Sequence, residues 1–432
     1  MSWYQIFVIG LSVCLNALDG FDVLAITFAA PGISHDWAIS LAGLGVVISS
    51  GLIGMVAGSI FIAPLADRFG RRPIVLASLV LMSGGMLLTS TSSSIPVLCG
   101  WRILTGLGIG GMIAAINAVA SEFSSERRRD LSVSIMTIGY PIGGLVGGLA
   151  SAVLVEKFGW PSIFVAGGLA TLAFLPIVWF SLPESIDFLN TRTDQGSAAR
   201  INLTLGRMGH PPARQAQGLG PSPLGMSSLF GPQYRTLTIL LVGAYFLHIM
   251  TFYFYSGWLP KIMTDGGFAV SASIATSAIM NIGGIIGGLL LGWAAPVLGL
   301  KRLTVGAMCG TTVMMALFGL APANLAVLRI IAFLLGFFMF GGIVGLYAFL
   351  ARAFPAGLRV TGSGLAIACG RGGAVVGPIL GGVLLQEGLR PGAALVVIGF
   401  AAALGALFLG RIRLGEPKRV GAGLALGAKS PT

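Results

Sequence analysis

The chain has 432 residues, of which 55% are hydrophobic and only 9% are charged, and its mean hydropathy is +0.93. Soluble domains carry about 25% charged residues, so this composition excludes an ordinary water-soluble protein. The net charge of +12 would suit a nucleic-acid-binding protein, but the positions of the basic residues, given below, exclude nucleic acid as a partner.

Twelve apolar stretches follow one another along the chain. A helix needs roughly 20 apolar residues to cross a hydrocarbon core of about 30 Å. The stretches that meet this length lie near residues 3–31, 41–64, 74–94, 97–119, 131–154, 162–181, 237–259, 270–295, 303–322, 325–349, 361–385 and 392–412. The sequence therefore predicts an all-α membrane protein with twelve transmembrane helices.

The first stretch carries two acidic residues at its centre. It begins at Trp3 without a preceding basic segment, so we expect a membrane helix and not a cleavable signal peptide. Within the sequence LDGFD, Asp19 and Asp22 are three residues apart and share one helix face. Each carboxylate costs roughly 2.5–3.5 kcal/mol at the centre of a membrane helix. We expect the pair to handle protons or to contact a substrate; the alternative is a buried structural pair.

The loop after the second stretch reads APLADRFGRRP at 63–73. It resembles the loop signature of the major facilitator superfamily, Gly-x-Leu-Ala-Asp-Arg-x-Gly-Arg, with Ala63 in place of the first glycine. The resemblance implies that this loop acts in gating, with Asp67 capping a neighbouring helix. The gating set is Asp67, Arg68, Gly70, Arg71 and Arg72. A turn that only sets topology would explain the arginines but not the aspartate.

The fourth stretch contains WRILTGLGIGG at 101–111, which resembles the arginine-and-glycine motif of the same superfamily. The resemblance associates Arg102 with proton transfer. This residue lies about five residues, or ~8 Å, below the outer surface. Two interpretations stay open, a pairing with Asp22 and an outward extension of the side chain.

Six polar residues lie near mid-membrane when depth is counted at about 1.5 Å per residue, and carriers bind substrates at this depth. They are Asn16, Asp19, Tyr140, His248, Asn281 and Arg371. The guanidinium of Arg371 needs an anionic partner, for which we favour a substrate carboxylate over Asp19. His248 is equally consistent with a titrating group and with a neutral core residue.

The seventh stretch is rich in aromatic residues. Such a stripe usually faces lipid or forms an interfacial belt, and we expect this of Trp258 near the outer edge. Tyr253 is a candidate for stacking on a substrate ring.

A polar connection at 183–236, rich in Gly, Pro, Arg and Ser, separates a first half, 1–182, from a second half, 237–412, which is followed by a tail, 413–432. The segments 58–75 and 287–305 repeat at an offset of about 229, each a glycine-rich helix that runs into a short basic turn. We therefore expect two six-helix pseudo-repeats around a central cavity, as in the major facilitator fold.

The basic residues are distributed very unequally between the loops on the two sides of the membrane. If the N-terminus is inside, the inner loops hold 20 of the 26: Arg68, Arg71, Arg72, Arg127, Arg128, Arg129, Arg192, Arg200, Arg207, Arg214, Arg235, Lys301, Arg302, Arg352, Arg359, Arg411, Arg413, Lys418, Arg419 and Lys429. Only Lys157, Lys261 and Arg390 fall outside. This distribution predicts a multi-pass protein of the bacterial inner membrane with both termini in the cytoplasm.

Several motifs together resemble the aromatic acid:proton symporter family of the major facilitator superfamily. They are LDGFD, ADRFGRRP, RILTGLGIGG, PES-x-x-FL at 183–189, WLP at 258–260 and GRGGAVVGP. The resemblance implies a symporter that imports benzoate, hydroxybenzoates or similar acids with protons. The chain departs from the family in its short N-terminus and in Pro296, which replaces Asp67 in the second repeat, so the inner gate is expected to be asymmetric.

Other functions fit less well. A facilitator of another small organic anion and a proton-driven drug exporter remain alternatives. No nucleophile–base pair, HExxH motif or metal-ligand cluster is present, and the four cysteines show no paired spacing, so we expect neither an enzyme nor a cofactor or metal. The expected partners are a small aromatic acid, protons and the lipid bilayer, and the carrier is expected to be monomeric.

The predicted topology is tested by labelling single cysteines introduced at positions 200 and 425. Because both lie in segments predicted to be cytoplasmic, a membrane-impermeant thiol reagent should label them only after the membrane is opened. Labelling of either position in intact cells would contradict the topology and the depth assignments.

Overall fold

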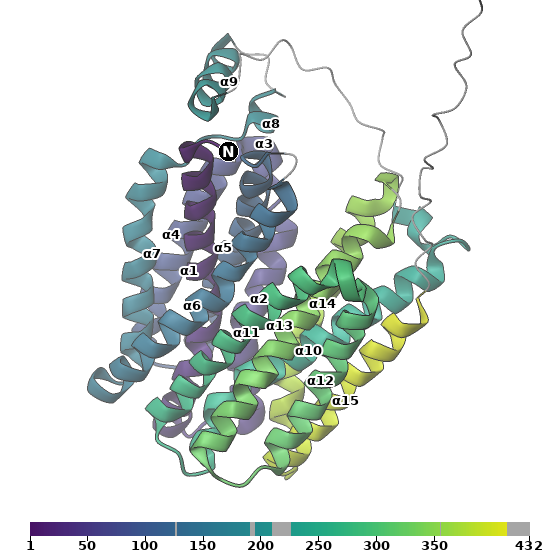
Figure 1. Ribbon diagram of the computed structural model, residues 1–432. Coiled ribbons are helices and arrows are strands. Elements are labelled where there is room, and N and C mark those ends of the chain that lie inside the picture. Colours follow the sequence, from purple (N-terminus) through teal and green to yellow (C-terminus); the bar gives the residue numbers. More distant parts are fainter. Residues whose placement is uncertain (126–127, 191–194, 210–225, 355, 413–432) are drawn as a thin grey trace, which may run out of the picture.

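The computed structural model describes residues 1–125, 128–190, 195–209, 226–354 and 356–412 (Figure 1). Within these ranges, twelve helices are long and apolar enough to cross a membrane, which confirms the prediction. They are α1 (Trp3–Trp37), α2 (Leu41–Phe61), α4 (Arg71–Ser90), α5 (Ile95–Glu122), α6 (Arg129–Phe158), α7 (Pro161–Ser181), α10 (Arg235–Asp265), α11 (Val270–Leu298), α12 (Leu300–Leu320), α13 (Leu325–Ala353), α14 (Ala356–Gln386) and α15 (Pro391–Arg411). The expected tail, 413–432, lies outside the described residues.

Shorter helices lie in the connections. They are α3 (Leu65–Phe69), α8 (Ile186–Asn190), α9 (Gln195–Met208) and the 3-10 helix η2 (Met226–Phe230). Of these, α8, α9 and η2 belong to the polar connection between the halves, and α8 and α9 pack on each other through Phe188, Leu189 and Ile201.

The same helix pairs form in both halves. In the first, α1 packs on α6, α2 on α5, and α4 on both α5 and α7. In the second, α10 packs on α14, α11 on α13, and α12 on both α13 and α15. Each pair of the second half joins the counterparts of a pair in the first, so the two six-helix units have one architecture.

Glycines spaced four residues apart bring equivalent helices into close contact. A Cβ atom on Gly54 would overlap the main-chain oxygen of Ile103, and α2 and α5 therefore touch backbone to backbone. Gly283 of α11 meets the main-chain oxygen of Phe333 in the same way. Helices in lipid gain no hydrophobic stabilisation from meeting each other, so this close approach and its dispersion contacts hold them together.

The two halves touch mainly at one end. We call the end that carries the N-terminus the inner end and the opposite one the outer end. The Ala42 amide donates to Gln386 at 3.0 Å at the outer end, and nearer the middle Ser49 of α2 donates to the Val375 oxygen of α14 at 2.9 Å. Ser271 of α11 also bonds Glu156 of α6. Toward the inner end the halves diverge (Figure 1), so they lie closer together at the outer end than at the inner end.

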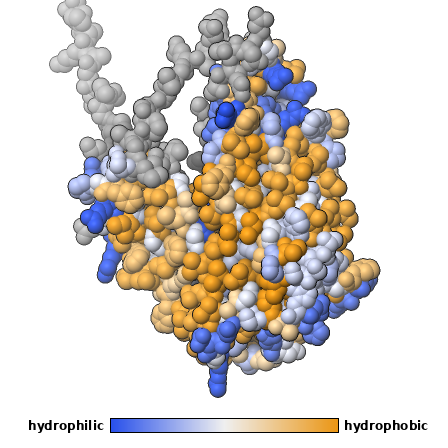
Figure 2. Space-filling model, turned by 180° about the vertical axis from the view of Figure 1, so that it is seen from behind, coloured by the Kyte–Doolittle hydropathy of each residue, from blue (hydrophilic) through white to orange (hydrophobic). Residues whose placement is uncertain are grey.

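The surface matches a membrane environment. Figure 2 shows apolar side chains over the middle of the molecule and hydrophilic ones gathered toward its two ends. Large apolar side chains along the membrane-spanning helices are exposed, including Phe400 at 64% and Val153 at 55%. Acyl chains rather than water are the solvent for such a band.

Candidate functional site

Residues from both halves meet at mid-membrane. Asp19 of α1 interacts electrostatically with Tyr140 of α6 and with Arg371 of α14, and Tyr253 of α10 interacts with both Tyr140 and Arg371. Tyr140, Tyr253 and Arg371 are each partly accessible, whereas Asp19 is fully buried. Of the residues predicted at mid-membrane depth, Tyr140 and Arg371 lie near Asp19, although they are 121 and 352 positions away from it in the sequence.

Arg371 is the accessible cation of this group. Its Nη1 donates to the main-chain oxygen of Met55, in the opposite half, over 3.4 Å. Among the described residues no carboxylate lies within ion-pair distance of this guanidinium, so the alternative of a direct Asp19 ion pair is not realised in this conformation. The remaining donors are free to receive a planar anion in two-point fashion.

Aromatic residues lie near the cation and pack on one another. Tyr245 and Tyr347 form an edge-to-face pair with centroids 5.8 Å apart, and Tyr245 interacts electrostatically with Arg371. Phe252 lies edge-to-face with Tyr253 at 5.0 Å and with Phe340 at 5.1 Å. Of these rings, Tyr253 and Tyr347 are partly accessible and can meet a flat aromatic ligand, whereas Tyr245, Phe252 and Phe340 are buried behind them.

The expectation that the aromatic stripe of α10 faces lipid is wrong. Trp258 is fully buried, and its Nε1 donates to the main-chain oxygen of Pro378 at 3.0 Å. Tyr255 and Phe254 are also buried. The stripe instead packs α10 onto the other helices of its half: Trp258 binds α14 through this hydrogen bond, and Tyr255 lies edge-to-face with Phe318 of α12 at 5.4 Å.

Asp22 and Arg102 form a second charged group, enclosed in the first half. The guanidinium of Arg102 donates to the main-chain oxygen of Asp22 at 2.7 Å and to Met86 Sδ at 3.3 Å. It lies 5.7 Å from the ring centroid of Phe164. Arg102 is only 1% exposed, so it does not extend to the outer surface. Of the two interpretations, the structure favours the association with Asp22.

Of the other polar residues predicted at mid-membrane, Asn16 and His248 tie helices together, and Asn281 bonds within its own helix. Asn16 donates to the Met136 oxygen at 2.8 Å and ties α1 to α6. His248 bonds the Met339 oxygen through Nε2 at 3.0 Å, and its Nδ1 is buried without a partner among the described residues. Asn281 bonds the Ser277 oxygen of its own helix at 2.9 Å, which leaves Asn281 Oδ1 buried and unpaired in the described part of the chain.

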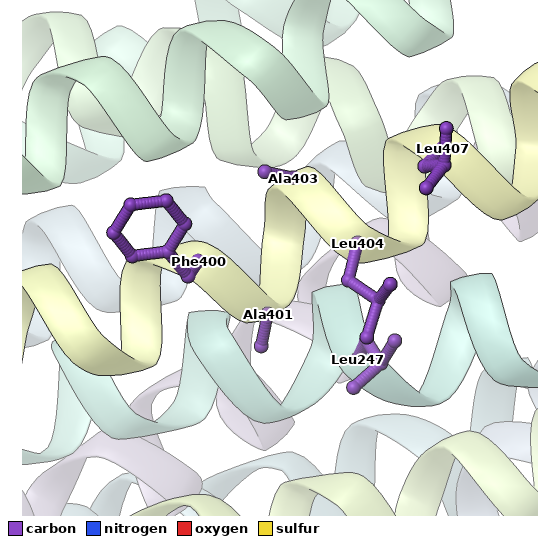
Figure 3. Close-up of a pocket in the computed structure, with 6 residues that line it drawn as sticks. All are labelled: Leu247, Phe400, Ala401, Ala403, Leu404 and Leu407. Carbon is purple, nitrogen blue, oxygen red and sulfur yellow. The ribbon is translucent and has the colours of Figure 1, made fainter.

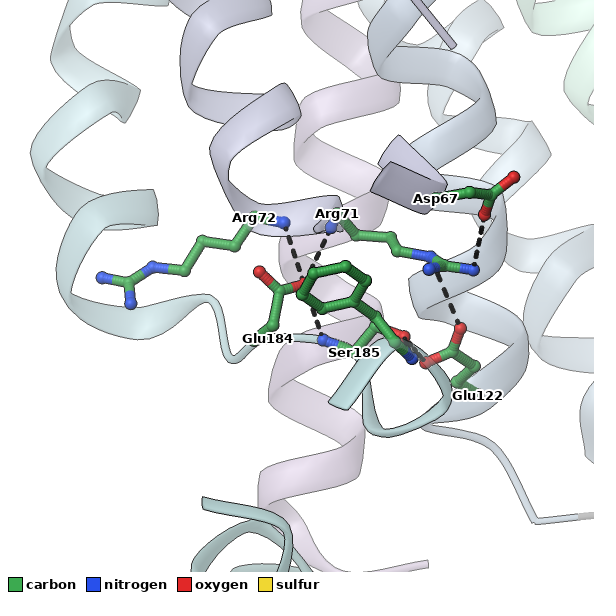
Figure 4. A network of polar contacts seen from close by, with 7 residues as sticks. Asp67, Arg71, Arg72, Glu122, Glu184 and Ser185 are labelled. Carbon is green, nitrogen blue, oxygen red and sulfur yellow. Dashed lines mark hydrogen bonds and ion pairs between the residues drawn. The ribbon is translucent and has the colours of Figure 1, made fainter. Parts of the chain in front are cut away.

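The predicted gating loop joins a polar network at the inner end (Figure 4). Arg71 pairs with Asp67 at 3.0 Å and lies 3.9 Å from Glu122. Glu184 accepts from the amides of Arg71 at 2.8 Å, Arg72 at 3.3 Å and Ser185 at 2.9 Å. The hydroxyl of Ser185 donates to Glu122 at 2.5 Å. All these residues belong to the first half or to the connection that follows it.

Asp67 and Glu184 have different surroundings in this network. Asp67 has an exposed side chain, at 79%, and among the described ion pairs it pairs only with Arg71; its capping of a neighbouring helix stays a prediction. Glu184 occupies the capping position, and this role was missed because the carboxylate lies 113 residues away from the amide of Arg71 in the sequence. Gly70 allows the Glu184 side chain to come close to the start of α4. It has a φ of 106°, and a Cβ atom at this position would overlap the Glu184 carboxylate and press on the Phe188 ring.

Arg68 and Arg72 also contribute at the inner end. The Arg68 guanidinium lies 5.5 Å from the Phe69 ring centroid, and the Arg72 guanidinium lies 5.7 Å from that of Trp179 and donates to its main-chain oxygen. Lys301, one repeat later, similarly donates to the Ile412 oxygen at 2.7 Å. The basic contact to the last helix of each half thus recurs, but the acidic network does not, because Pro296 and Leu300 occupy the positions of Asp67 and Arg71.

A crevice on the outside of the bundle is unrelated to this chemistry. It lies between α10 and α15 and is lined by Leu247, Phe400, Ala401, Ala403, Leu404 and Leu407 (Figure 3). Since its lining side chains carry no polar group, it offers an acyl chain a place but has no means to bind an ion.

Known proteins similar to this chain are membrane transporters. The family model described as the Major Facilitator Superfamily matches residues 12–378 and 241–429. The chain is 32% identical over 426 residues to the gallate transporter of Pseudomonas putida, covering 95% of this chain and 93% of that protein. It is 31% identical over 402 residues to the 4-hydroxybenzoate transporter of Pseudomonas aeruginosa, covering 90% and 88%.

Solved structures share the fold. The inward-open xylose transporter of E. coli matches with a TM-score of 0.73 at 17% identity, covering 96% of this chain and 98% of that one. An inward-facing bacterial homologue of the lysosomal transporter Spinster matches with a TM-score of 0.72.

The inner network predicts that the carboxylates of Glu184 and Asp67 contribute unequally to the stability of the start of α4. Glu184→Ala removes the acceptor from three amides and should cost about 1–2 kcal/mol locally, which corresponds to roughly 5- to 30-fold faster hydrogen exchange at the start of α4. Asp67→Ala removes an exposed pair and should change this exchange little. Hydrogen exchange followed by mass spectrometry measures both; equal effects of the two substitutions would contradict the capping role of Glu184.

Proposed function

This chain belongs to the major facilitator superfamily and, within it, to the aromatic acid:proton symporter family, and we propose that it imports small aromatic carboxylates together with protons by alternating access. The bacterial inner membrane, cytoplasmic termini and a monomeric carrier are parts of the same proposal. The observation that carries it is Arg371, an accessible cation at mid-membrane among aromatic side chains. The relatives named as transporters of gallate and 4-hydroxybenzoate support the choice of substrate.

The substrate carboxylate binds the guanidinium of Arg371. Two parallel N–H···O bonds fit a carboxylate, and they fix its orientation as well as its charge. The aromatic ring of the substrate then lies among Tyr140, Tyr245 and Tyr253, and Tyr347, which is 40% exposed, lines the path toward the inner end. A substrate thus needs both an anionic group and a flat apolar body.

Protonation of the acidic pair supplies the coupling. An unprotonated carboxylate at mid-membrane costs roughly 2.5–3.5 kcal/mol, so closing the cavity around Asp19 or Asp22 is easier once one is neutral. The proton gradient then drives accumulation, since the loaded carrier closes outside and opens inside as the two halves rock. In this proposal, the conformation in which the halves diverge at the end that carries the N-terminus is the state that releases both to the cytoplasm.

Two rival functions are separated by uptake assays. A carrier of aliphatic anions would show no preference for aromatic acids in proteoliposomes. A drug exporter would expel cations in exchange for protons, and Arg371 at mid-membrane disfavours a cationic cargo. The aromatic acids to test are benzoate, 4-hydroxybenzoate and gallate.

Arg371→Lys should weaken binding of the preferred acid at least tenfold, because an ammonium cannot form the two-point contact of a guanidinium. Affinity is measured with labelled acid on purified protein. Arg390→Lys, the same substitution at an exposed position outside the cavity, is the control and should bind as wild type does. Unchanged affinity of a well-folded Arg371→Lys protein would remove Arg371 from the carboxylate site.

The acidic pair is tested by comparing two transport modes. Asp19→Asn and Asp22→Asn mimic protonated forms, so the variant of the coupling residue should lose uptake driven by an inward proton gradient. It should keep counterflow exchange of labelled for unlabelled acid, because exchange needs no net proton movement. If both variants accumulate substrate as wild type does, the proton site lies elsewhere, with His248 and Glu122 the next candidates.

A further inference from the structure

The two aspartates of α1 have different surroundings. Both are fully buried, and none of their four carboxylate oxygens has a hydrogen-bond partner among the described residues. Their cationic neighbours differ, however: Arg102 donates to the main-chain oxygen of Asp22 at 2.7 Å, whereas the cation whose charge acts on Asp19 is Arg371, which reaches into the first half as far as the Met55 oxygen. One helix thus supplies a carboxylate to each of two separate cations.

The cation next to Asp22 is shut inside the first half. Besides the Asp22 oxygen on α1, Arg102 contacts Met86 on α4 and the ring of Phe164 on α7. A Cβ atom on Gly51 of α2 would lie 3.1 Å from its Nη2, so a fourth helix closes the pocket. Because all four helices belong to one half, this pair keeps its surroundings when the halves move against each other.

The cation next to Asp19 lies on the boundary between the halves. Arg371 belongs to α14 of the second half, is partly accessible and reaches Met55 of α2. The charged or titratable groups around Asp19 are Asp22 on its own helix, Tyr140 on α6 and Arg371 on α14. Arg102 on α5 interacts with Asp22, and Tyr253 on α10 interacts with Tyr140 and Arg371. Asp19 is therefore the acidic group whose counter-charge a substrate can take over.

We infer that Asp19, and not Asp22, is the residue that couples the proton to the substrate: the substrate carboxylate on Arg371 replaces the Asp19 carboxylate as counter-charge, and Asp19 takes up one proton. The proton comes from the outer solution, forms an O–H bond on one Asp19 oxygen and leaves to the inner solution after the substrate. The inference rests on the proposed function, since it requires an anionic substrate at Arg371.

Charge balance gives the physical reason. The empty site holds one guanidinium and one carboxylate, and the loaded site holds the guanidinium, the substrate carboxylate and a neutral Asp19. Both states are neutral overall, so both can be occluded in the membrane. A loaded site without the proton would carry a net negative charge in a medium that solvates it poorly. The enclosed Asp22 and Arg102 balance each other in either state.

The test measures binding between pH 5.5 and 9.5 on the full-length protein in nanodiscs. The probe is whichever of benzoate, 4-hydroxybenzoate and gallate binds wild type most tightly at pH 5.5. Wild-type affinity should fall toward tenfold per pH unit in the alkaline part of the range, because binding then requires uptake of a proton. Asp19→Asn should bind with little pH dependence and at least tenfold more tightly than wild type at pH 9.5, whereas Asp22→Asn should keep the wild-type slope.

A second measurement covers the case in which Asp22→Asn does not fold. Titration calorimetry in buffers of different ionisation enthalpy should show uptake of one proton per substrate by wild type in the alkaline range, and none by Asp19→Asn. A slope that persists in Asp19→Asn, one that disappears in Asp22→Asn, or a wild-type affinity that is constant with pH would overturn the inference. Absence of binding of all three acids to wild type would instead contradict the proposed function.

Discussion

Charge in a hydrocarbon environment is the constraint on which the rest of this structure depends. Asp19, Asp22, Arg102 and Arg371 lie within the membrane-spanning helices, where an uncompensated charge costs several kilocalories per mole. The structure meets this cost in two ways. Asp22 and Arg102 are enclosed by helices of a single half. Asp19 of the first half and Arg371 of the second half lie on the boundary between the halves. Only the second arrangement leaves a cation partly accessible, so an enclosed charge and the proposed substrate site lie within one turn of α1.

The packing of the helices supports both arrangements. Glycine contacts such as Gly54 on Ile103 hold each half as a rigid unit, while the hydrogen bonds between the halves at the outer end are few. The inner network of Arg71, Glu122 and Glu184 stays within the first half and its following connection. It therefore fixes the shape of one half without tying it to the other, which leaves the inner end able to open.

Much of the fold was predictable, because membrane spans depend on local composition and length. Depth counting also placed Asp19, Tyr140 and Arg371 at one level, and the structure brings them together. Depth does not give the direction in which a side chain points around its helix. For that reason the sequence suggested lipid exposure for Trp258, which is buried, and gave no sign that Glu184 caps the start of α4. Both contacts join segments that are far apart in the sequence.

The central claim is that one proton and one carboxylate cross as a neutral pair, and its most direct test separates the two components of the proton gradient. In proteoliposomes, an inward pH gradient with the membrane potential clamped to zero should drive accumulation of labelled 4-hydroxybenzoate, whereas an inside-negative potassium diffusion potential alone should not. Protein-free liposomes correct for diffusion of the neutral acid. Accumulation driven by the potential alone, or no accumulation with the pH gradient beyond that of protein-free liposomes, would contradict the account.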